Sequence, residues 1–280
     1  MAYFAPTDLN DALSILREHR PKIIAGCTDY FPSKNIGKPA TSLLDISRIE
    51  DLRGIEKIGD HWRIGAATTW SNLIAAKLPS YFRGLKLAAR EVGSVQIQNS
   101  ATIVGNICNA SPAADGVPPL LTLDAEIEIC GQTSQRIIPL SAFILRPRQI
   151  DLRPDEFVTS IRVPLQSDQV RSHFLKLGSR TYLVISIAMI SVTVRLARSI
   201  IDSTHIAVGS CTPVAVRLTK LEKFLTGQTV HALKRVVLPD NLFSELAPIT
   251  DVRATAQYRK AVVPELCRRA ILQAAEVGPP

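Results

Sequence analysis

Residues 25–29 read Ala-Gly-Cys-Thr-Asp, and residues 102–106 read Thr-Ile-Val-Gly-Asn. A short apolar run before the first stretch predicts a strand that leads into a loop. Gly26 lets the backbone turn tightly and approach a ligand. The N–H groups that follow can form a nest for phosphate oxygens, and Thr28 adds a hydroxyl donor. Gly105-Asn106 is a turn dipeptide of similar character. By themselves both stretches are compatible with a dinucleotide site, but a glycine after a strand is most often an ordinary turn. Neither has the G-x-G-x-x-G spacing of a Rossmann nucleotide fold.

A third stretch, Asn-Ala-Ser-Pro-Ala-Ala-Asp at residues 109–115, follows closely behind the second. The Ser, Asn and Gln residues of 94–111 predict irregular structure. Pro112 predicts the first turn of a short helix, with Ser111 as its cap. Small residues, a helix start and a carboxylate therefore follow the second glycine stretch.

Composition and charge exclude several classes of protein. The chain has 280 residues, 46% apolar and 21% charged, which is typical of a globular protein with one large or two smaller domains. The longest apolar stretch, 182–194, is shorter than the roughly 20 residues of a spanning helix, so no membrane span is predicted. The N-terminus lacks a signal-peptide pattern, which predicts a cytoplasmic protein.

The five cysteines form no C-x-x-C pair or metal-ligand spacing, so no metal site is predicted. The net charge of +8 comes from scattered Lys and Arg residues without interleaved aromatic residues, a pattern that disfavours nucleic-acid binding. An anionic cofactor or an acidic partner subunit explains the sign of the charge equally well.

Periodicity predicts an α+β protein. The first helix begins after a cap at Thr7 or Asp8, and a hairpin turns at Gly59-Asp60. A polar break at residues 166–169 predicts two domains, 1–166 and 170–277. The other predicted helices cover 81–92, 218–225 and 254–275, the last with Pro264 starting, kinking or breaking it. The other predicted strands cover 22–25, 43–46, 125–130, 136–140, 172–178, 184–196 and 206–210.

Taken in order, the three stretches resemble the FAD-binding medium subunit of the xanthine dehydrogenase and carbon monoxide dehydrogenase family, the molybdenum hydroxylases. That family has Ala-Gly-Gly-Thr-Asp, then Gln-Ile-Arg-Asn-x-Gly-Thr-Ile-Gly-Gly-Asn, then Asn-Ala-Ser-Pro-x-x-Asp. Here residues 96–106 read Gln-Ile-Gln-Asn-Ser-Ala-Thr-Ile-Val-Gly-Asn. Residues 174–180 are similar to the family's Lys-x-x-x-Arg segment, and residues 251–259 to its Asp-x-Arg-x-x-x-x-Tyr-Arg motif.

The resemblance implies a two-lobed, PCMH-type FAD-binding domain at residues 1–166 and an antiparallel sheet with packed helices at 170–277. It implies a cytoplasmic oxidoreductase subunit in a heteromeric complex. Electrons would pass from a partner iron–sulfur subunit, fed by a molybdenum cofactor subunit, through FAD to NAD+ or another acceptor. No residue of this chain is expected to act as a catalytic acid or base.

The resemblance also implies the residues that bind FAD. The first loop would hold the diphosphate together with the second, Ser111 and Asp115 would face the flavin end or the ribityl chain, and Lys176 would lie near the flavin. Val158 is a further, weaker candidate. The first loop contributes Ile23, Ile24, Ala25, Gly26, Cys27, Thr28, Asp29 and Tyr30, and the second contributes Thr102, Ile103, Val104, Gly105 and Asn106.

Four positions depart from the family pattern. Cys27 and Val104 each replace a glycine, Gln98 replaces Arg and Ala101 replaces Gly. A Cβ at a position that needs positive φ costs on the order of 1 kcal/mol, and more for a β-branched residue. The alternative is therefore a degenerate structural subunit of the same complex with weakened or lost FAD binding.

Overall fold

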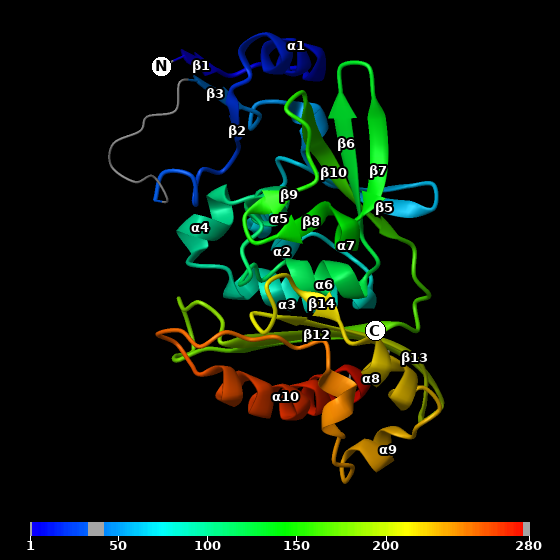
Figure 1. Cartoon of the computed structure of the whole chain (residues 1–280). Helices are drawn as coiled ribbons and strands as arrows, with labels where there is room; N and C mark the ends of the chain where they lie inside the picture. Colours follow the sequence, from blue (N-terminus) through cyan, green and yellow to red (C-terminus); the bar gives the residue numbers. More distant parts are fainter. Residues whose placement is uncertain (1, 33–41, 277–280) are drawn as a thin grey trace. The chain divides into compact units, whose positions relative to one another are not determined.

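The computed structural model describes residues 2–32 and 42–276 (Figure 1). The chain forms two compact units and passes between them several times. The first unit comprises Met1–Ala76, Ser94–Ala110 and Ala125–Leu165, and the second comprises Lys77–Gly93, Ser111–Asp124 and Gln166–Pro280. The division of the sequence into domains at 166–170 stays a prediction, because units defined by contact and domains defined by sequence are different partitions.

The first unit opens with a small parallel sheet in the order β1-β3-β2, with α1 between β1 and β2. The predicted N-terminal helix is confirmed, because the carboxylate of Asp8 accepts a hydrogen bond from the Asp11 N–H at its start. Its apolar face is buried through Ala12, Leu13 and Leu16. The bounds are β1 (Ala2–Phe4), α1 (Leu9–His19), β2 (Lys22–Ile24) and β3 (Ser42–Asp45).

An antiparallel sheet in the order β4-β5-β10-β6-β7 forms the larger part of this unit. The predicted hairpin at its edge is confirmed, and Gly59 at its turn has φ +54°. The central strand β10 was not predicted. Its residues are buried almost without interruption, so they show no alternating pattern. The bounds are β4 (Ile55–Ile58), β5 (His61–Gly65), β6 (Glu126–Gly131), β7 (Gln135–Pro139) and β10 (Glu156–Pro164).

Short helices accompany these two sheets: η1 (Glu50–Leu52), α2 (Trp70–Ala75), α4 (Val95–Ser100), α5 (Ile103–Asn109) and α7 (Leu140–Phe143). The ribbon of β8 (Ile144–Arg146) and β9 (Gln149–Ile150) completes the unit. The prediction of irregular structure over 94–111 was wrong. Ser94 and Thr102 are helix N-caps, and each accepts a hydrogen bond from the backbone three residues on.

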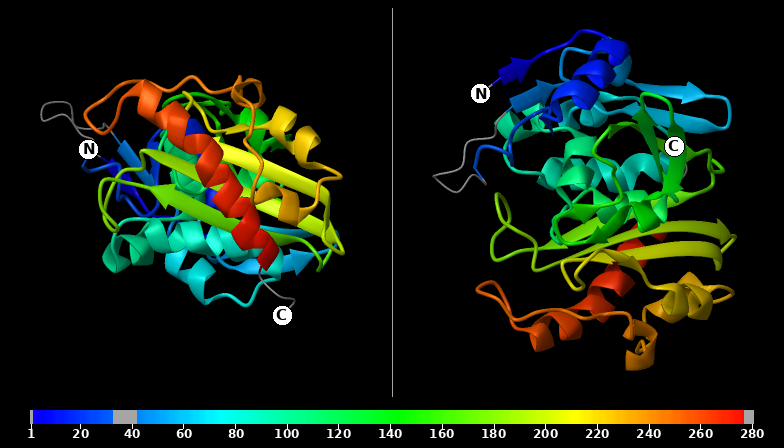
Figure 2. Two further views of the ribbon diagram at one scale, coloured as in Figure 1. Left: turned by 90° about the horizontal axis from the view of Figure 1, so that it is seen from below. Right: turned by 45° about the horizontal axis from the view of Figure 1, so that its top comes forward.

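The second unit is built on an antiparallel sheet in chain order, β11 (Arg171–Leu177), β12 (Ala188–Ala197), β13 (Ile200–Gly209) and β14 (Val216–Arg217). The three long strands confirm the prediction. η2 (Ser80–Phe82), α3 (Arg83–Glu91) and α6 (Val117–Thr122) pack on one face of the sheet. The other face carries α8 (Thr219–Leu225), α9 (Val230–Leu233), η3 (Asp240–Phe243) and α10 (Ala256–Glu276), and Figure 2 shows α10 crossing it.

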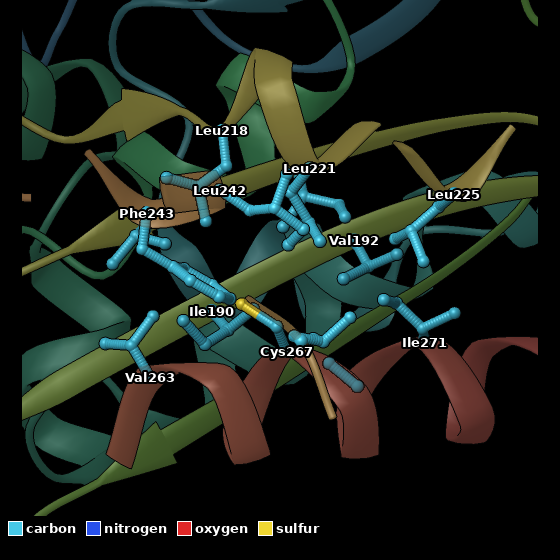
Figure 3. Packing of buried hydrophobic residues seen from close by; sticks show 14 of the residues in the cluster. Ile190, Val192, Leu218, Leu221, Leu225, Leu242, Phe243, Val263, Cys267 and Ile271 are labelled. Carbon is cyan, nitrogen blue, oxygen red and sulfur yellow. The ribbon is translucent and has the colours of Figure 1, made fainter. Parts of the chain in front are cut away.

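Alternation along β12 separates the two faces of this sheet. Ile190 and Val192 enter the apolar core beneath α8 and α10, where they meet Leu221 and Cys267 (Figure 3). Met189 lies in a smaller cluster on the opposite face. Because side chains alternate along a strand, one strand supplies both cores. The predicted last helix is confirmed, and it continues through Pro264 without starting or ending there.

Candidate functional site

The first glycine stretch forms a turn directly after β2, as predicted. Cys27 has φ +59°, in the left-handed region that favours glycine. Its thiol lies 3.4 Å from the carbonyl oxygen of Ala25. Within the described residues, the backbone N–H groups of Gly26, Cys27, Thr28 and Asp29 donate to no protein acceptor. The turn therefore offers consecutive backbone donors, which is the chemistry that binds phosphate oxygens.

Gly26 brings this turn against the chain that leads into the second stretch. A Cβ on Gly26 would lie 1.9 Å from the carbonyl oxygen of Ser100 and 2.8 Å from the Cα of Ala101. No side chain fits at such distances, so only glycine permits this approach of two backbones. The structure thus brings the two glycine stretches together within the first unit, although 70 or more residues separate them in the sequence.

The second stretch is the start of helix α5. Thr102 caps the helix, and its hydroxyl accepts from the Gly105 N–H at 2.9 Å. Ile103 donates its N–H to the Thr68 carbonyl. Val104 is helical, without positive φ, and is 5% exposed. The strain expected for a side chain at this position does not arise, because Val104 packs into the interior with ordinary helical backbone.

Asp115 and Lys176, both in the second unit, form a buried ion pair. Lys176 Nζ lies 2.9 Å from Asp115 Oδ2 and also donates to the Glu91 carbonyl at 3.2 Å. The Ser186 hydroxyl donates to Asp115 Oδ1 at 2.9 Å. Burial raises the pKa of the Asp115 carboxyl, and the nearby Lys176 ammonium and the Ser186 hydrogen bond oppose that rise. Both carboxylate oxygens are hydrogen-bonded, so the carboxylate and the ammonium are held in one arrangement.

Ser111 takes no part in this ion pair. Its hydroxyl accepts from the Ala113 N–H at 3.3 Å within a turn, and α6 begins only at Val117. The predicted helix with Pro112 in its first turn is therefore wrong. The Ser-Pro pair builds a local side-chain turn instead, a frequent use of serine.

Two hydrogen-bond partners of the Asp115–Lys176 ion pair were not predicted from the sequence. Ser186 interrupts an apolar run, and a polar residue in a buried strand pattern signals an internal hydrogen bond. The Glu91 carbonyl at the end of α3 has no sequence signal at all, because any residue carries the same group. The close approach of the Ser100 and Ala101 backbone to Gly26 was not predicted for the same reason.

The Asp-x-Arg-x-x-x-x-Tyr-Arg motif has a structural task in the second unit. Arg259 is 2% exposed and donates to the carbonyls of Ile187 and Ser210 and, at 2.7 Å, to Asp251. Arg253 also donates to Asp251. Burial raises the pKa of Asp251, but these hydrogen bonds lower it more, so the carboxyl stays ionised well below its usual range. The motif ties the loop before α10 to the ends of β12 and β13.

The described residues contain no group of three or more His, Cys, Asp or Glu side chains arranged to hold a metal ion. In residues 2–32 and 42–276, no helix combines the length and the apolar character that crossing a bilayer requires.

Two family models match consecutive parts of the chain. Residues 1–166 match the FAD binding domain in molybdopterin dehydrogenase, and residues 173–274 match the CO dehydrogenase flavoprotein C-terminal domain. These matches define a flavoprotein subunit of molybdenum-containing oxidoreductases. Within that class, the chain belongs to the FAD-binding medium subunits of the xanthine dehydrogenase and carbon monoxide dehydrogenase family.

Two curated relatives match nearly the whole chain, and a third matches about two thirds of it. The xanthine dehydrogenase FAD-binding subunit of Escherichia coli O157:H7 is 27% identical, covering 98% of this chain and 95% of the relative. The carbon monoxide dehydrogenase medium chain of Hydrogenophaga pseudoflava is also 27% identical, covering 96% and 95%. The nicotinate dehydrogenase FAD-subunit of Eubacterium barkeri is 33% identical, covering 66% and 65%.

Solved structures give the same fold. A chain of carbon monoxide dehydrogenase from Hydrogenophaga pseudoflava superposes with a TM-score of 0.88 at 26% identity, covering 98% of this chain and 97% of that one. A chain of quinoline 2-oxidoreductase from Pseudomonas putida 86 superposes with a TM-score of 0.86 at 19% identity, covering 99% and 97%, which shows the fold alone. The predicted α+β fold, with an FAD-binding part and a carbon monoxide dehydrogenase-type C-terminal part, is confirmed.

Proposed function

We propose that this chain binds the diphosphate of FAD at the two glycine stretches and transfers electrons within a heteromeric molybdenum hydroxylase. The observation that carries the proposal is the contact of Gly26 with the backbone of Ser100 and Ala101. That contact places the unused N–H groups of the first turn beside the start of α5. A glycine held where a Cβ would collide, next to consecutive free backbone donors, suits a diphosphate.

The protein's contribution is binding and orientation. FAD supplies the redox chemistry when it is bound. The residues of the first loop would be Ile23, Ile24, Ala25, Gly26, Cys27, Thr28, Asp29 and Tyr30, and those of the second would be Thr102, Ile103, Val104, Gly105 and Asn106. Of these, the side chains of Ile24, Ile103 and Val104 are buried and would support the loops from beneath, without touching the phosphates.

In the second unit, Ser111, Asp115 and Lys176 would serve the flavin end of the cofactor. The Asp115 carboxyl and the Glu91 carbonyl together hold the Lys176 ammonium in a fixed place. A fixed cation beside a flavin stabilises negative charge on the reduced ring. Lys176 would thereby raise the flavin's reduction potential.

The partners follow from the relatives, which are named as subunits or medium chains of dehydrogenases and hydroxylases. In this proposal the chain accepts electrons from an iron–sulfur subunit that is served by a molybdenum cofactor subunit. It passes them to NAD+ or another acceptor, in the cytoplasm.

The alternative of a degenerate subunit without FAD rested on Cys27 and Val104. The helical backbone of Val104 removes one of the two arguments for it. Cys27 remains as the one glycine replacement at positive φ, and its thiol lies against its own loop.

An anaerobic titration of the purified complex tests the acceptor. If NAD+ is the acceptor, NADH in excess reverses the electron flow and bleaches the flavin absorbance near 450 nm, a band typical of oxidised FAD. A flavin that dithionite bleaches and NADH leaves unchanged would point to another acceptor. A complex in which substrate reduces the iron–sulfur centres but never the flavin would contradict the electron-transfer role.

A further inference from the structure

A groove on the second unit carries three cations along one helix. It is lined by Leu78, Pro79, Ser80, Arg83, Lys86, Leu87 and Arg90 and has a volume of about 370 Å³. All these residues belong to the second unit, in the segment that leads into α3 and in α3 itself. None of them is among the residues assigned to FAD.

Hydrogen bonds tie both sides of the groove to β11 or to the residue just before it. Gly84 N–H donates to the Ser172 hydroxyl at 2.7 Å, and a Cβ on Gly84 would meet the His173 carbonyl at 3.2 Å, so α3 lies close on the strand. On the other side, the Ser80 hydroxyl donates to the Val170 carbonyl at 3.0 Å. The cationic face is therefore held in one position.

The three cations lie on the face of α3 opposite its buried residues. Arg83 and Arg90 are exposed and Lys86 is half-buried between them. Burial and the neighbouring Arg90 lower the pKa of Lys86, which shows that the two like charges are close enough to interact. Arg83 forms no ion pair with any carboxylate of the described chain. An anion over the groove would be attracted by all three cations.

The spacing favours one kind of anion. Arg83, Lys86 and Arg90 follow one another at about one helical turn, so the cations extend over about 10 Å. The oxygens of a single phosphate are too close together to contact all three. Carboxylates placed along a peptide match this length, and Leu78, Pro79 and Leu87 offer apolar contact to the same peptide.

We propose that this groove, the α3 groove, binds an acidic segment of a partner subunit of the complex. The net charge of +8 fits an acidic partner. That the occupant is a subunit of the same complex rests on the proposed function. The chemistry of the occupant, a peptide with several carboxylates, rests on the groove alone.

The test uses the complete complex, purified through a tag on this chain. The double variant Arg83→Glu/Arg90→Gln is compared with Lys234→Glu/Lys260→Gln, which makes the same charge change at two exposed residues of the second unit outside the groove. The groove variant is expected to bind its partners about tenfold more weakly or worse, with a loss that grows at low salt. The control variant should assemble like wild type. Both should keep their flavin absorbance.

A zero-length carbodiimide cross-link gives the second measurement. The Lys86 amine should couple to an Asp or Glu of a partner subunit, identified by mass spectrometry of the wild-type complex. Assembly that is equal in both variants, with no cross-link from Lys86 to a partner, would overturn the groove proposal and leave the proposed function intact. A wild-type chain that purifies without partners would overturn both.

Discussion

Gly26 is the residue at which the prediction from the sequence and the structure of the site agree most closely. Its contact with the Ser100 carbonyl explains why a glycine stands there, whereas the sequence only suggested a turn. Gly105 is different, because a Cβ there would meet only the hydroxyl of Thr102 at 2.7 Å. A side chain at residue 26 would therefore collide with backbone, whereas a side chain at residue 105 would meet only the Thr102 side chain.

This difference gives a paired prediction. Gly26→Ala forces the first turn away from residues 100–101, so we expect loss of most bound FAD. In Gly105→Ala the new Cβ would meet only the Thr102 side chain, so we expect a smaller loss of FAD than in Gly26→Ala. FAD released by heat from each purified variant measures the effect. Equal retention in both variants would show that the approach of the two loops does not form the site.

Cys27 shows what the loss of a family glycine costs. Its φ of +59° is tolerated by a side chain with one Cβ substituent, at roughly 1 kcal/mol. We expect Cys27→Val to lower the free energy of unfolding by about 1–3 kcal/mol, because a β-branched residue fits this region poorly. Cys27→Gly should be neutral or stabilising by up to about 1 kcal/mol. Urea unfolding of the three proteins measures both effects. A Val variant as stable as wild type would contradict the positive φ at residue 27.

His173 gives the pH dependence at the residue scale. Burial, with a contribution from the Arg83 cation, lowers its pKa to about 4 from 6.5, against a hydrogen bond with Gln273 that raises it. Its folded pKa lies below its unfolded value, so the neutral form is the stable one. The stabilisation is complete above pH 6.5 and is lost progressively as the pH falls towards 4.

We therefore expect wild type to unfold at a lower urea concentration at pH 5 than at pH 7. His173→Gln should reduce this difference, whereas the exposed His231→Gln should leave it unchanged. A pH difference of the same size in all three proteins would show that other groups cause it.

At the scale of elements, local signals located most helices and strands. Asp8 before α1 and the alternation in β11 and β12 were readable because capping and periodicity are local. Helices α4 and α5 were missed because each is short and contains Asn, Gln or Gly residues typical of turns, although Ser94 and Thr102 are good caps. Glu156 begins the buried strand β10, and Arg136 from β7 neutralises it at 2.8 Å. No local pattern predicts such a partner.

The Arg259 network joins α10 to the loop before it and to the ends of β12 and β13. Arg259→Met removes a buried cation, leaves Asp251 without one of its partners and frees two carbonyls. We expect a loss of about 3–5 kcal/mol in the free energy of unfolding. Arg269→Met removes an exposed pair with Glu265 from the same helix and should cost less than about 1 kcal/mol. Urea unfolding measures both losses. An equal loss in the free energy of unfolding for both substitutions would contradict the role assigned to Arg259.

At the scale of the whole molecule, the family could be predicted and the packing of the chain could not. The three stretches and the Arg259 motif identified the family, and the family models match the same residues. The return of residues 77–93 and 111–124 to the unit built mainly by the C-terminal part depends on contacts between distant segments. Periodicity carries no information about such contacts. The pairing of Asp115 with Lys176 was missed for this reason, although each was named separately.

The central claim is that the chain holds FAD despite Cys27. The most direct measurement is the visible spectrum of the purified complex, together with the FAD released per chain. We predict flavin bands near 370 and 450 nm and about one FAD per chain. A folded, fully assembled complex without these bands and without releasable FAD would contradict the account.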